Sequence, residues 1–381
     1  MTAPVWIIPD QVFDGATLRG GMALQFSDDV VTAVQAETTL PAAHKVHKIK
    51  GIITPGLIDL QVNGGGDVLL NQVPTPAGMA TIAAAHRRFG TVAILPTLIT
   101  DAPEVLGHAA GAAIAAKGQS GIIGLHIEGP HISVARRGTH AACFVRPLDE
   151  TTMNIVRGLR AAGIAVMITL APEAVSPGQI AALAATGAVV SIGHSDATAD
   201  LTRMALAEGA SCFTHLFNAM SPMLNRSAGV VGAAINSTAP AGIICDGIHV
   251  ADEMVGLAIR ARPLPDTMFL VSDAMSTVGG SDHFTLYGQT IWLRDGRLVN
   301  DEGSLAGAHV TMAESLQRLV NVVGVPAEAA LRMAVTVPAR VIGRPDLARL
   351  EGRALADLLL LDAQFGATPL QGRLTALASQ A

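Results

Sequence analysis

The chain has 381 residues, half of them apolar and 15% charged, and its net charge is −6 at pH 7. Such a length is too great for one small domain and small for three. The negative charge and the 3% aromatic content argue against nucleic-acid binding, which needs basic surfaces and stacking rings. No apolar run approaches the roughly 18 residues of a membrane span, so we expect no membrane partner.

The cysteines bear on the compartment in which the protein works. Cys143, Cys212 and Cys245 are odd in number and lack the spacing of a metal site. We expect them to be reduced, as they are in a cytoplasmic protein. The residues around Trp6 contain neither the basic region nor the apolar core of a secretion signal. Cytoplasmic localisation is therefore the expectation.

Residues 5–50 alternate apolar and polar side chains between turn signals, which predicts a small sheet. After a turn at 53–56, short apolar runs begin to alternate with alanine-rich helical stretches. The predicted strands cover 57–62, 91–95, 122–127, 165–170, 188–193, 211–214, 242–245 and 268–272. The predicted helices cover 77–89, 102–117, 149–162, 178–186, 197–208, 251–261, 309–322 and 326–341. This alternation predicts an α/β fold, a (β/α)8 TIM-like barrel.

The barrel is expected to span residues 54–344, with a hairpin inserted at 281–303. An apolar strand within 352–362 is expected to return to the N-terminal sheet. Residues 1–53 and 345–381 are therefore predicted to form a small β-sandwich domain from both chain termini. On the predicted helix 77–89, His86 stands among alanines and arginines, so we expect it on a solvated face.

Five of the predicted barrel strands stop at a residue with reactive chemistry, among them the seventh, which stops at Asp246. Glu128 follows the third strand, His194 and His215 follow the fifth and sixth, and Asp273 follows the eighth. The C-terminal ends of barrel strands form the active site in this architecture. Two imidazoles and a carboxylate can bind a divalent metal and leave a position open for water. Asp273 would then serve as the base, while the alternative for each histidine is a hydrogen-bonded core residue.

Seven segments extend this pattern over nearly the whole chain. They are PGLIDLQVNG at 55–64, GLHIEGP at 124–130, RGTH at 137–140, GHS at 193–195, THLFNAM at 214–220, DGIH at 246–249 and SDA at 272–274. In this order they resemble the amidohydrolase superfamily and, within it, the N-acetylglucosamine-6-phosphate deacetylases. The resemblance implies a barrel with a β-sandwich built from both termini. It also implies hydrolysis of N-acetylglucosamine 6-phosphate to glucosamine 6-phosphate and acetate.

The same resemblance implies roles for the strand-end residues. Glu128, His194 and His215 match the ligands of a divalent metal ion, one per subunit, with zinc expected first and iron(II) or another divalent ion as alternatives. The ion would activate a water molecule as the nucleophile. Asp273 matches the acid that accepts the water's proton and passes it to the departing amine.

Many members of the superfamily begin the barrel with His-x-His, which holds a second metal. Gln61 and Asn63 occupy these positions here, and neutral amides are poor ligands for transition metals. We therefore expect a single ion. Gln61 and Asn63 are interpreted either as polar plugs of the barrel mouth or as groups that position water or ligand.

The family pattern also implies a binding site for a phosphorylated N-acetyl amino sugar. The matching substrate-binding residues are Thr139, His140, Asn218, Ala219, Arg226, Asp246, His249, Leu305, Ala306 and Gly307. Arg226 can pair with phosphate oxygens, and its family counterpart reaches the neighbouring subunit's site, which implies a homodimer. The alternatives are a solvated loop charge for Arg226 and a structural role for His249.

Two departures from the family pattern are expected to border the pocket. His131 and Met275 replace residue types that are common in relatives, so the accepted acyl group or sugar epimer could differ. Other amidohydrolase substrates thus stay open, namely N-acetylgalactosamine 6-phosphate or a cyclic amide. A non-catalytic protein on the same scaffold is a further alternative. Against it, all four metal and acid residues are present.

Overall fold

The computed structural model describes residues 5–40, 46–300 and 305–370. Its largest sheet has eight strands in the order β15-β14-β13-β12-β11-β10-β9-β6. These strands are β6 (Leu57–Val62), β9 (Thr91–Ile99), β10 (Gly124–Glu128), β11 (Ala165–Leu170), β12 (Val189–Ile192), β13 (Cys212–Phe213), β14 (Ala241–Ile243) and β15 (Met268–Leu270). Each neighbouring pair is parallel, as the run of short apolar segments predicts.

The first and last strands meet just beyond the end of β15. The backbone N–H of Asp273 donates to the carbonyl of Gln61 at 3.0 Å, and that of Asn63 donates to the carbonyl of Ala274 at 2.9 Å. A parallel bridge joins Val62 to Ala274. The barrel is therefore closed, and its closure places the chain at Asp273 directly beside the Gln61–Asn63 segment.

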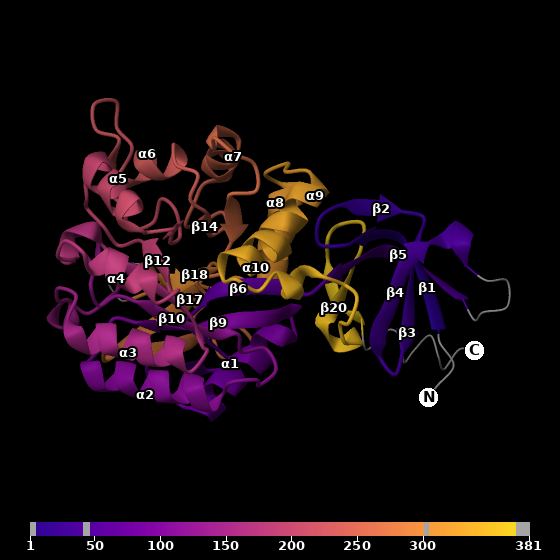
Figure 1. The fold of residues 1–381 in the computed structure, drawn as a ribbon, viewed down its shortest axis with the longest axis horizontal. Helices are drawn as coiled ribbons and strands as arrows, with labels where there is room; N and C mark the ends of the chain where they lie inside the picture. Colours follow the sequence, from indigo (N-terminus) through magenta and orange to yellow (C-terminus); the bar gives the residue numbers. More distant parts are fainter. Residues whose placement is uncertain (1–4, 41–45, 301–304, 371–381) are drawn as a thin grey trace.

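Helices surround the barrel (Figure 1). They are α1 (Pro76–Arg87), α2 (Pro103–Ala115), α3 (Glu150–Ala161), α4 (Gln179–Ala185), α5 (Ala199–Glu208), α6 (Gly229–Ile235), α7 (Asp252–Ala261), α8 (Met312–Asn321), α9 (Ala327–Leu331) and α10 (Val337–Val341). Thr75, Asp149, Thr198 and Thr311 each cap a helix by accepting a backbone N–H of its first turn. The short helix α6 was not predicted. Within the described chain, no helix has the length and apolar character that a membrane crossing requires.

The small domain is one hydrogen-bonded sheet in the order β21-β20-β5-β1-β3-β4, with β2 paired to β1. Its strands are β1 (Val5–Phe13), β2 (Leu18–Gly20), β3 (Met22–Ser27), β4 (Val30–Ala36), β5 (Val46–Pro55), β20 (Leu358–Leu361) and β21 (Ala367–Pro369). Because β20 pairs with β5, both ends of the chain build this domain, as predicted. Figure 1 shows it beside the barrel. Residues 1–4, 41–45 and 371–381 of the predicted domain lie outside the described residues.

The predicted hairpin insertion is a four-stranded antiparallel sheet. Its strands are β16 (His283–Leu286), β17 (Gln289–Arg294), β18 (Arg297–Val299) and β19 (Leu305–Ala308), and a further short pair joins β7 (Gly64–Gly65) to β8 (Val68–Leu69). The turn between β17 and β18 falls at Asp295-Gly296, while residues 301–304 lie outside the described chain. Phe284, Ile291 and Leu298 pack in one apolar cluster with Met275, so the insertion is anchored near the end of β15.

One expectation about α1 is wrong. His86 is fully buried rather than solvated, and its Nε2 lies 2.9 Å from the carbonyl oxygen of Gly64. A side chain at Gly65 would place its Cβ 2.9 Å from the imidazole ring, so glycine lets this segment approach the helix. His86 therefore ties α1 to the segment that follows the first barrel strand.

Candidate active site

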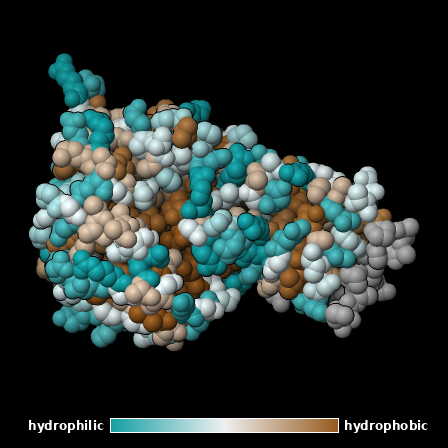
Figure 2. Space-filling model, in the orientation of Figure 1, coloured by the Kyte–Doolittle hydropathy of each residue, from teal (hydrophilic) through white to brown (hydrophobic). Residues whose placement is uncertain are grey.

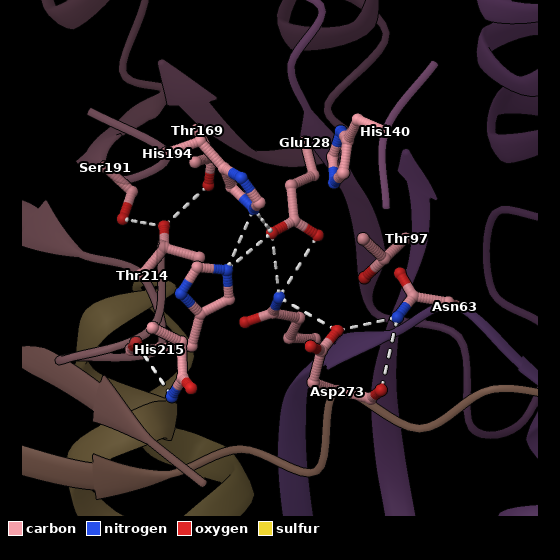
Figure 3. Close-up of polar contacts among 12 residues, drawn as sticks. Asn63, Thr97, Glu128, His140, Thr169, Ser191, His194, Thr214, His215 and Asp273 are labelled. Atoms are coloured by element: carbon pink, nitrogen blue, oxygen red, sulfur yellow. Dashed lines mark hydrogen bonds and ion pairs between the residues drawn. The ribbon is translucent and has the colours of Figure 1, made fainter. Parts of the chain in front are cut away.

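Three predicted metal ligands converge at the C-terminal end of the barrel. Glu128 is the last residue of β10, and His194 and His215 follow β12 and β13. Oε1 of Glu128 lies 3.1 Å from Nε2 of His194 and 3.0 Å from Nε2 of His215. The three ligand atoms all lie within 4.8 Å of one another. Figure 3 shows the two rings and the carboxylate pointing toward one spot.

The chemistry of this donor set fits one divalent cation. Nδ1 of His194 lies 2.9 Å from the carbonyl of Arg136, so the ring donates there and turns the lone pair of Nε2 inward. The two Nε2 atoms face each other at 3.0 Å beside the buried carboxylate of Glu128. Nδ1 of His215 has no hydrogen-bond partner among the described residues, so its Nε2 is also free to present a lone pair when a cation binds. Two imidazoles and one carboxylate suit zinc or iron(II).

The electrostatics of the cluster also favour a bound cation. Burial alone would raise the pKa of Glu128, but the hydrogen bonds and charges of His194 and His215 hold that pKa well below its usual range. Burial lowers the pKa of His215, yet the hydrogen bond and charge of Glu128 outweigh it and the net pKa is raised. The buried carboxylate is therefore anionic and attracts positive charge to this spot.

Asp273 lies beside the cluster, in the segment that closes the barrel. Burial, followed by the charge of Glu128, raises the pKa of Asp273 to about 6, while His215, Asn63 and His249 act in the opposite direction. A carboxyl group with a pKa in this range exchanges a proton readily near neutral pH, which is the property a general base and acid requires.

The two amides that replace His-x-His both contact this carboxyl group. Nδ2 of Asn63 donates to Oδ1 of Asp273 at 2.7 Å, and Nε2 of Gln61 donates to the same oxygen at 3.1 Å. Nε2 of Gln61 also lies 3.0 and 3.1 Å from the two oxygens of Glu128. Both amides therefore hold carboxylates in place, and the positioning of water or ligand by these amides stays a prediction.

The backbone of these residues is unusual. His194, His215 and Asp273 have positive φ angles of 48°, 28° and 53°, and Ala219 has a φ of 49°. Such left-handed conformations cost non-glycine residues roughly 1 kcal/mol or more each, and they gather at functional sites. At the ends of β12, β13 and β15, these turns aim the side chains across the barrel mouth.

A cavity of about 210 Å³ opens over the cluster. It is lined by Asn63, Ile99, Glu128, Gly138, Thr139, His140, His194, His215, Asn218, Ala219, His249, Asp273, Met275, Leu305 and Gly307. Twelve of the predicted site residues are in this lining. Ile99 and Gly138 were not predicted: Ile99 lies beyond the predicted end of its strand, and Gly138 stands inside the RGTH segment.

Comparison with known proteins agrees with this geometry. Residues 52–380 match the profile of the Amidohydrolase family. The chain belongs to the amidohydrolase family. Among its amidohydrolase relatives, it is 39% identical to the N-acetylgalactosamine-6-phosphate deacetylase of Shewanella sp. (strain ANA-3), and the alignment covers 92% of this chain and 90% of the relative. It is 30% identical to the N-acetylglucosamine-6-phosphate deacetylase of Haemophilus influenzae, over 90% and 91% of the two chains.

Solved amidohydrolase structures have the same fold over nearly the whole chain. The N-acetylglucosamine-6-phosphate deacetylase of Pasteurella multocida superposes with a TM-score of 0.87 at 32% identity, covering 96% of this chain and 97% of the other. A mutant of the Mycobacterium smegmatis deacetylase, solved in complex with N-acetyl-D-glucosamine-6-phosphate, superposes with a TM-score of 0.85 at 30% identity, with the same coverage. The predicted fold class and family are confirmed.

In this amidohydrolase, Asp246 lies behind the cavity and holds His249. Oδ2 of Asp246 lies 2.6 Å from Nδ1 of His249, and its Oδ1 accepts the backbone N–H groups of Ile248 and His249 at 2.8 Å. Burial would raise the pKa of Asp246, but the hydrogen bond with His249 outweighs it and lowers that pKa. With Nδ1 engaged, Nε2 of His249 is the nitrogen left for a ligand.

Three other predicted residues do not line the cavity. Ala306 is 2% exposed and packs in the apolar cluster of the insertion. Gln61 lies between Glu128 and Asp273, as described above. Arg226 is exposed on the loop before α6 and does not reach the cavity of its own chain.

Of the two departures from the family pattern, only Met275 borders the cavity. His131 is fully buried, with Nδ1 3.1 Å from the carbonyl of Arg146 and Nε2 3.0 Å from Oγ1 of Thr152. The expectation that His131 borders the pocket is wrong, because its ring ties the loop after β10 to α3. Met275 is therefore the departure that can affect the ligand.

A layer of hydroxyl groups lies near the predicted metal ligands, and this layer was not predicted (Figure 3). Oγ1 of Thr214 lies 2.6 Å from both Ser191 and Thr169, and Thr169 lies 2.8 Å from Nε2 of His126. His126 also contacts Thr97 at 3.3 Å. Burial lowers the pKa of His126 to about 4, so its ring is neutral and can donate and accept. This hydrogen-bond network links the strands that precede Glu128, His194 and His215.

Proposed function

We propose that this amidohydrolase removes the N-acetyl group of N-acetylglucosamine 6-phosphate and releases glucosamine 6-phosphate and acetate. The observation that carries the proposal is one cavity in which Glu128, His194 and His215 form a cation-ready cluster beside the carboxyl group of Asp273. Relatives at 30–39% identity over about nine-tenths of the chain are named as deacetylases of N-acetylhexosamine 6-phosphates.

One divalent ion, zinc or iron(II), is proposed for this cluster. When bound, such an ion lowers the pKa of a water ligand and polarises an acyl carbonyl. Asp273 takes the proton of the attacking water and gives it to the departing amine. Gln61 and Asn63 hold Asp273 in position, and its raised pKa of about 6 lets the proton move in both directions near neutral pH.

The sugar phosphate is proposed to lie along the remaining cavity wall. His249 presents its free ring nitrogen because Asp246 holds the other one. Thr139, His140, Asn218, Ala219, Leu305 and Gly307 line the rest of the cavity. Ala306 supports the loop from the insertion core rather than through a side-chain contact.

We propose a homodimer in which Arg226 reaches the cavity of the neighbouring subunit. The loop before α6 stands out from the barrel (Figures 1 and 2). Beside Arg226 it exposes Met223 and Leu224, with 44% and 60% of their surface accessible. An exposed apolar pair next to a cation suits contact with a second chain. Cytoplasmic localisation remains our proposal, supported by Cys143, Cys212 and Cys245, which are all free.

The 6-phosphate of N-acetylgalactosamine is the second candidate substrate, because the 39%-identical relative is named for it. Acetate release should be measured with the 6-phosphates of both sugars and with the unphosphorylated sugars. We expect hydrolysis of the phosphorylated sugars, with kcat/KM at least 100-fold lower for the unphosphorylated ones. Equal rates with and without the phosphate would contradict the proposal.

A further inference from the structure

A second cavity lies at the other end of the barrel, where the barrel meets the segment that leads to the small domain. It is lined by the N-terminal ends of β9 and β10, at Val92 and Gly124, and by residues between Arg344 and Asp357. Its volume is about 390 Å³, against about 210 Å³ for the active-site cavity. This cavity therefore has nearly twice the volume of the active-site cavity.

The wall of this cavity carries an excess of positive charge. Arg87, Lys117, Arg344 and Arg353 all line it, but Asp357 is the one carboxylate among the lining residues described. Asp357 forms ion pairs with two of these cations. Its Oδ1 lies 2.8 Å from Arg87, and its Oδ2 lies 3.7 Å from Arg353. One carboxylate cannot neutralise four cationic side chains.

Part of the hydrogen-bonding capacity of these cations is unused. Nε and Nη2 of Arg344 bind Asp346 at 2.9 and 2.8 Å, and Nη1 makes no hydrogen bond within the described chain. Nε and Nη2 of Arg353 bind the carbonyls of Arg349 and Asp346, while Nη1 has only the 3.7 Å contact with Asp357.

Lys117 is the least compensated of the four. Its ammonium donates one hydrogen bond, to the carbonyl of Ala162 at 2.8 Å. No carboxylate of residues 5–40, 46–300 and 305–370 lies within 4 Å of it. The carboxylates of Asp357 and Asp346 neutralise two of the four cationic side chains, so two positive charges remain.

The desolvation of Arg353 adds to this imbalance. Its side chain is only 13% exposed, and burial lowers its pKa. The charges of Arg344 and Arg87 lower that pKa further, although Asp357 and Asp346 oppose the shift. A partly desolvated guanidinium among like charges gains more from a bound anion than an exposed one.

We propose that this cavity binds a phosphorylated small molecule, with the phosphate at the free donors of Lys117, Arg344 and Arg353. A phosphate dianion matches the two uncompensated positive charges, and its oxygens suit the geometry of guanidinium groups. The ligand would join the loop after α2 to the segment that enters the small domain. By mass action, such binding stabilises the folded chain. The proposal does not depend on the reaction at the active site.

The test is calorimetric titration of the full chain, carrying its metal, with inorganic phosphate and with glucosamine 6-phosphate at low ionic strength. The variants are Lys117→Glu and Arg344→Glu, since both side chains are exposed and their replacement leaves the core intact. Arg260→Glu, an exposed charge reversal outside the cavity, is the matched control. His249→Ala distinguishes binding at the active site from binding at this second cavity.

We expect a saturable phosphate site that is at least tenfold weaker in Lys117→Glu and in Arg344→Glu, but unchanged in Arg260→Glu and His249→Ala. Glucosamine 6-phosphate should bind there more tightly than inorganic phosphate, because the cavity exceeds a phosphate group. Absence of a saturable site, or a site lost only in His249→Ala, would overturn the proposal. Equal affinity for the two ligands would overturn the assignment to an organic phosphate.

Discussion

The side-chain amide of Gln61 lies 3.1 Å from Oδ1 of Asp273, and its single nitrogen also donates to both oxygens of Glu128. One neutral donor thus holds the proposed base and the carboxylate of the metal cluster together. The amide adds no charge to a buried site that already holds two carboxyl groups. This relationship supports the proposal of a single ion at a site where Gln61 stands in place of a histidine.

Replacing this amide by a carboxylate should disturb the base rather than substrate binding. In Gln61→Glu, a third carboxyl group raises the pKa of Asp273 above its already raised value of about 6. We expect kcat at pH 7 to fall by roughly 100-fold with KM nearly unchanged. The acidic limb of the kcat–pH profile should move to higher pH, and recovery at high pH separates this effect from misfolding. An unmoved acidic limb would contradict the positioning role.

Loss of the base should spare the metal. Asp273→Asn keeps the size of the side chain, and it leaves the ligands Glu128, His194 and His215 in place. We expect full metal content, measured by elemental analysis, and a fall in kcat of roughly 1,000-fold or more. A variant with near-normal kcat would remove Asp273 from the mechanism.

Substitution of a proposed metal ligand should lower metal retention, whereas substitution of the neighbouring His140 should not. His140 packs against His194 with ring centroids 4.3 Å apart, but it is outside the ligand set. We expect His215→Ala to lose the ion on dialysis against a mild chelator, whereas His140→Ala keeps it under the same treatment. Equal metal retention in the two variants would show that the ion lies elsewhere.

Arg226 offers a test of the proposed homodimer. Arg226→Ala should raise KM for the phosphorylated sugar at least tenfold with little change in kcat, and Arg203→Ala, an exposed arginine of α5, serves as the control. Mixing Arg226→Ala chains with Asp273→Asn chains should then restore activity at low substrate concentration. In mixed dimers, an intact Asp273 site would receive Arg226 from its neighbour. No restoration after verified chain exchange would place Arg226 outside the neighbouring site.

Buried His86 should make stability fall with acidification. Burial lowers the pKa of His86 from 6.5 to about 4, so between these values the unfolded chain binds the proton and the folded chain does not. Stability is therefore lost as pH drops through this window, by up to about 3 kcal/mol. Denaturant unfolding of His86→Gln should show a smaller loss between pH 7 and 5 than His108→Gln, an exposed control. Equal losses would contradict this account.

Much of the barrel could be predicted because each strand is a short apolar run that stops at a glycine or polar residue. The predicted strand 165–170 coincides with β11. The limits of β9 were harder, since the strand continues through Pro96 and Thr97 to Ile99. The helix α6 has seven residues, all buried, so it lacks the polar face that makes a surface helix visible in a sequence.

The candidate site also contains some features that could be predicted from the sequence and others that could not. The convergence of Glu128, His194 and His215 could be predicted, because parallel strands bring their C-terminal ends together. The burial of His86 and His131 could not, since it depends on tertiary hydrogen-bond partners. These are the carbonyl of Gly64 for His86, and the carbonyl of Arg146 and Oγ1 of Thr152 for His131. The layer formed around Thr169 and Thr214 could not be predicted either, because it depends on which hydroxyl groups of neighbouring strands come within hydrogen-bond distance.

The most direct test of the central claim is acetate release from N-acetylglucosamine 6-phosphate by metal-depleted chain that is reloaded with measured equivalents of zinc or iron(II). We predict no release without metal and a linear rise that saturates at one ion per chain, set by Glu128, His194 and His215. Full acetate release from the metal-free chain, or saturation only at two ions, would contradict the account.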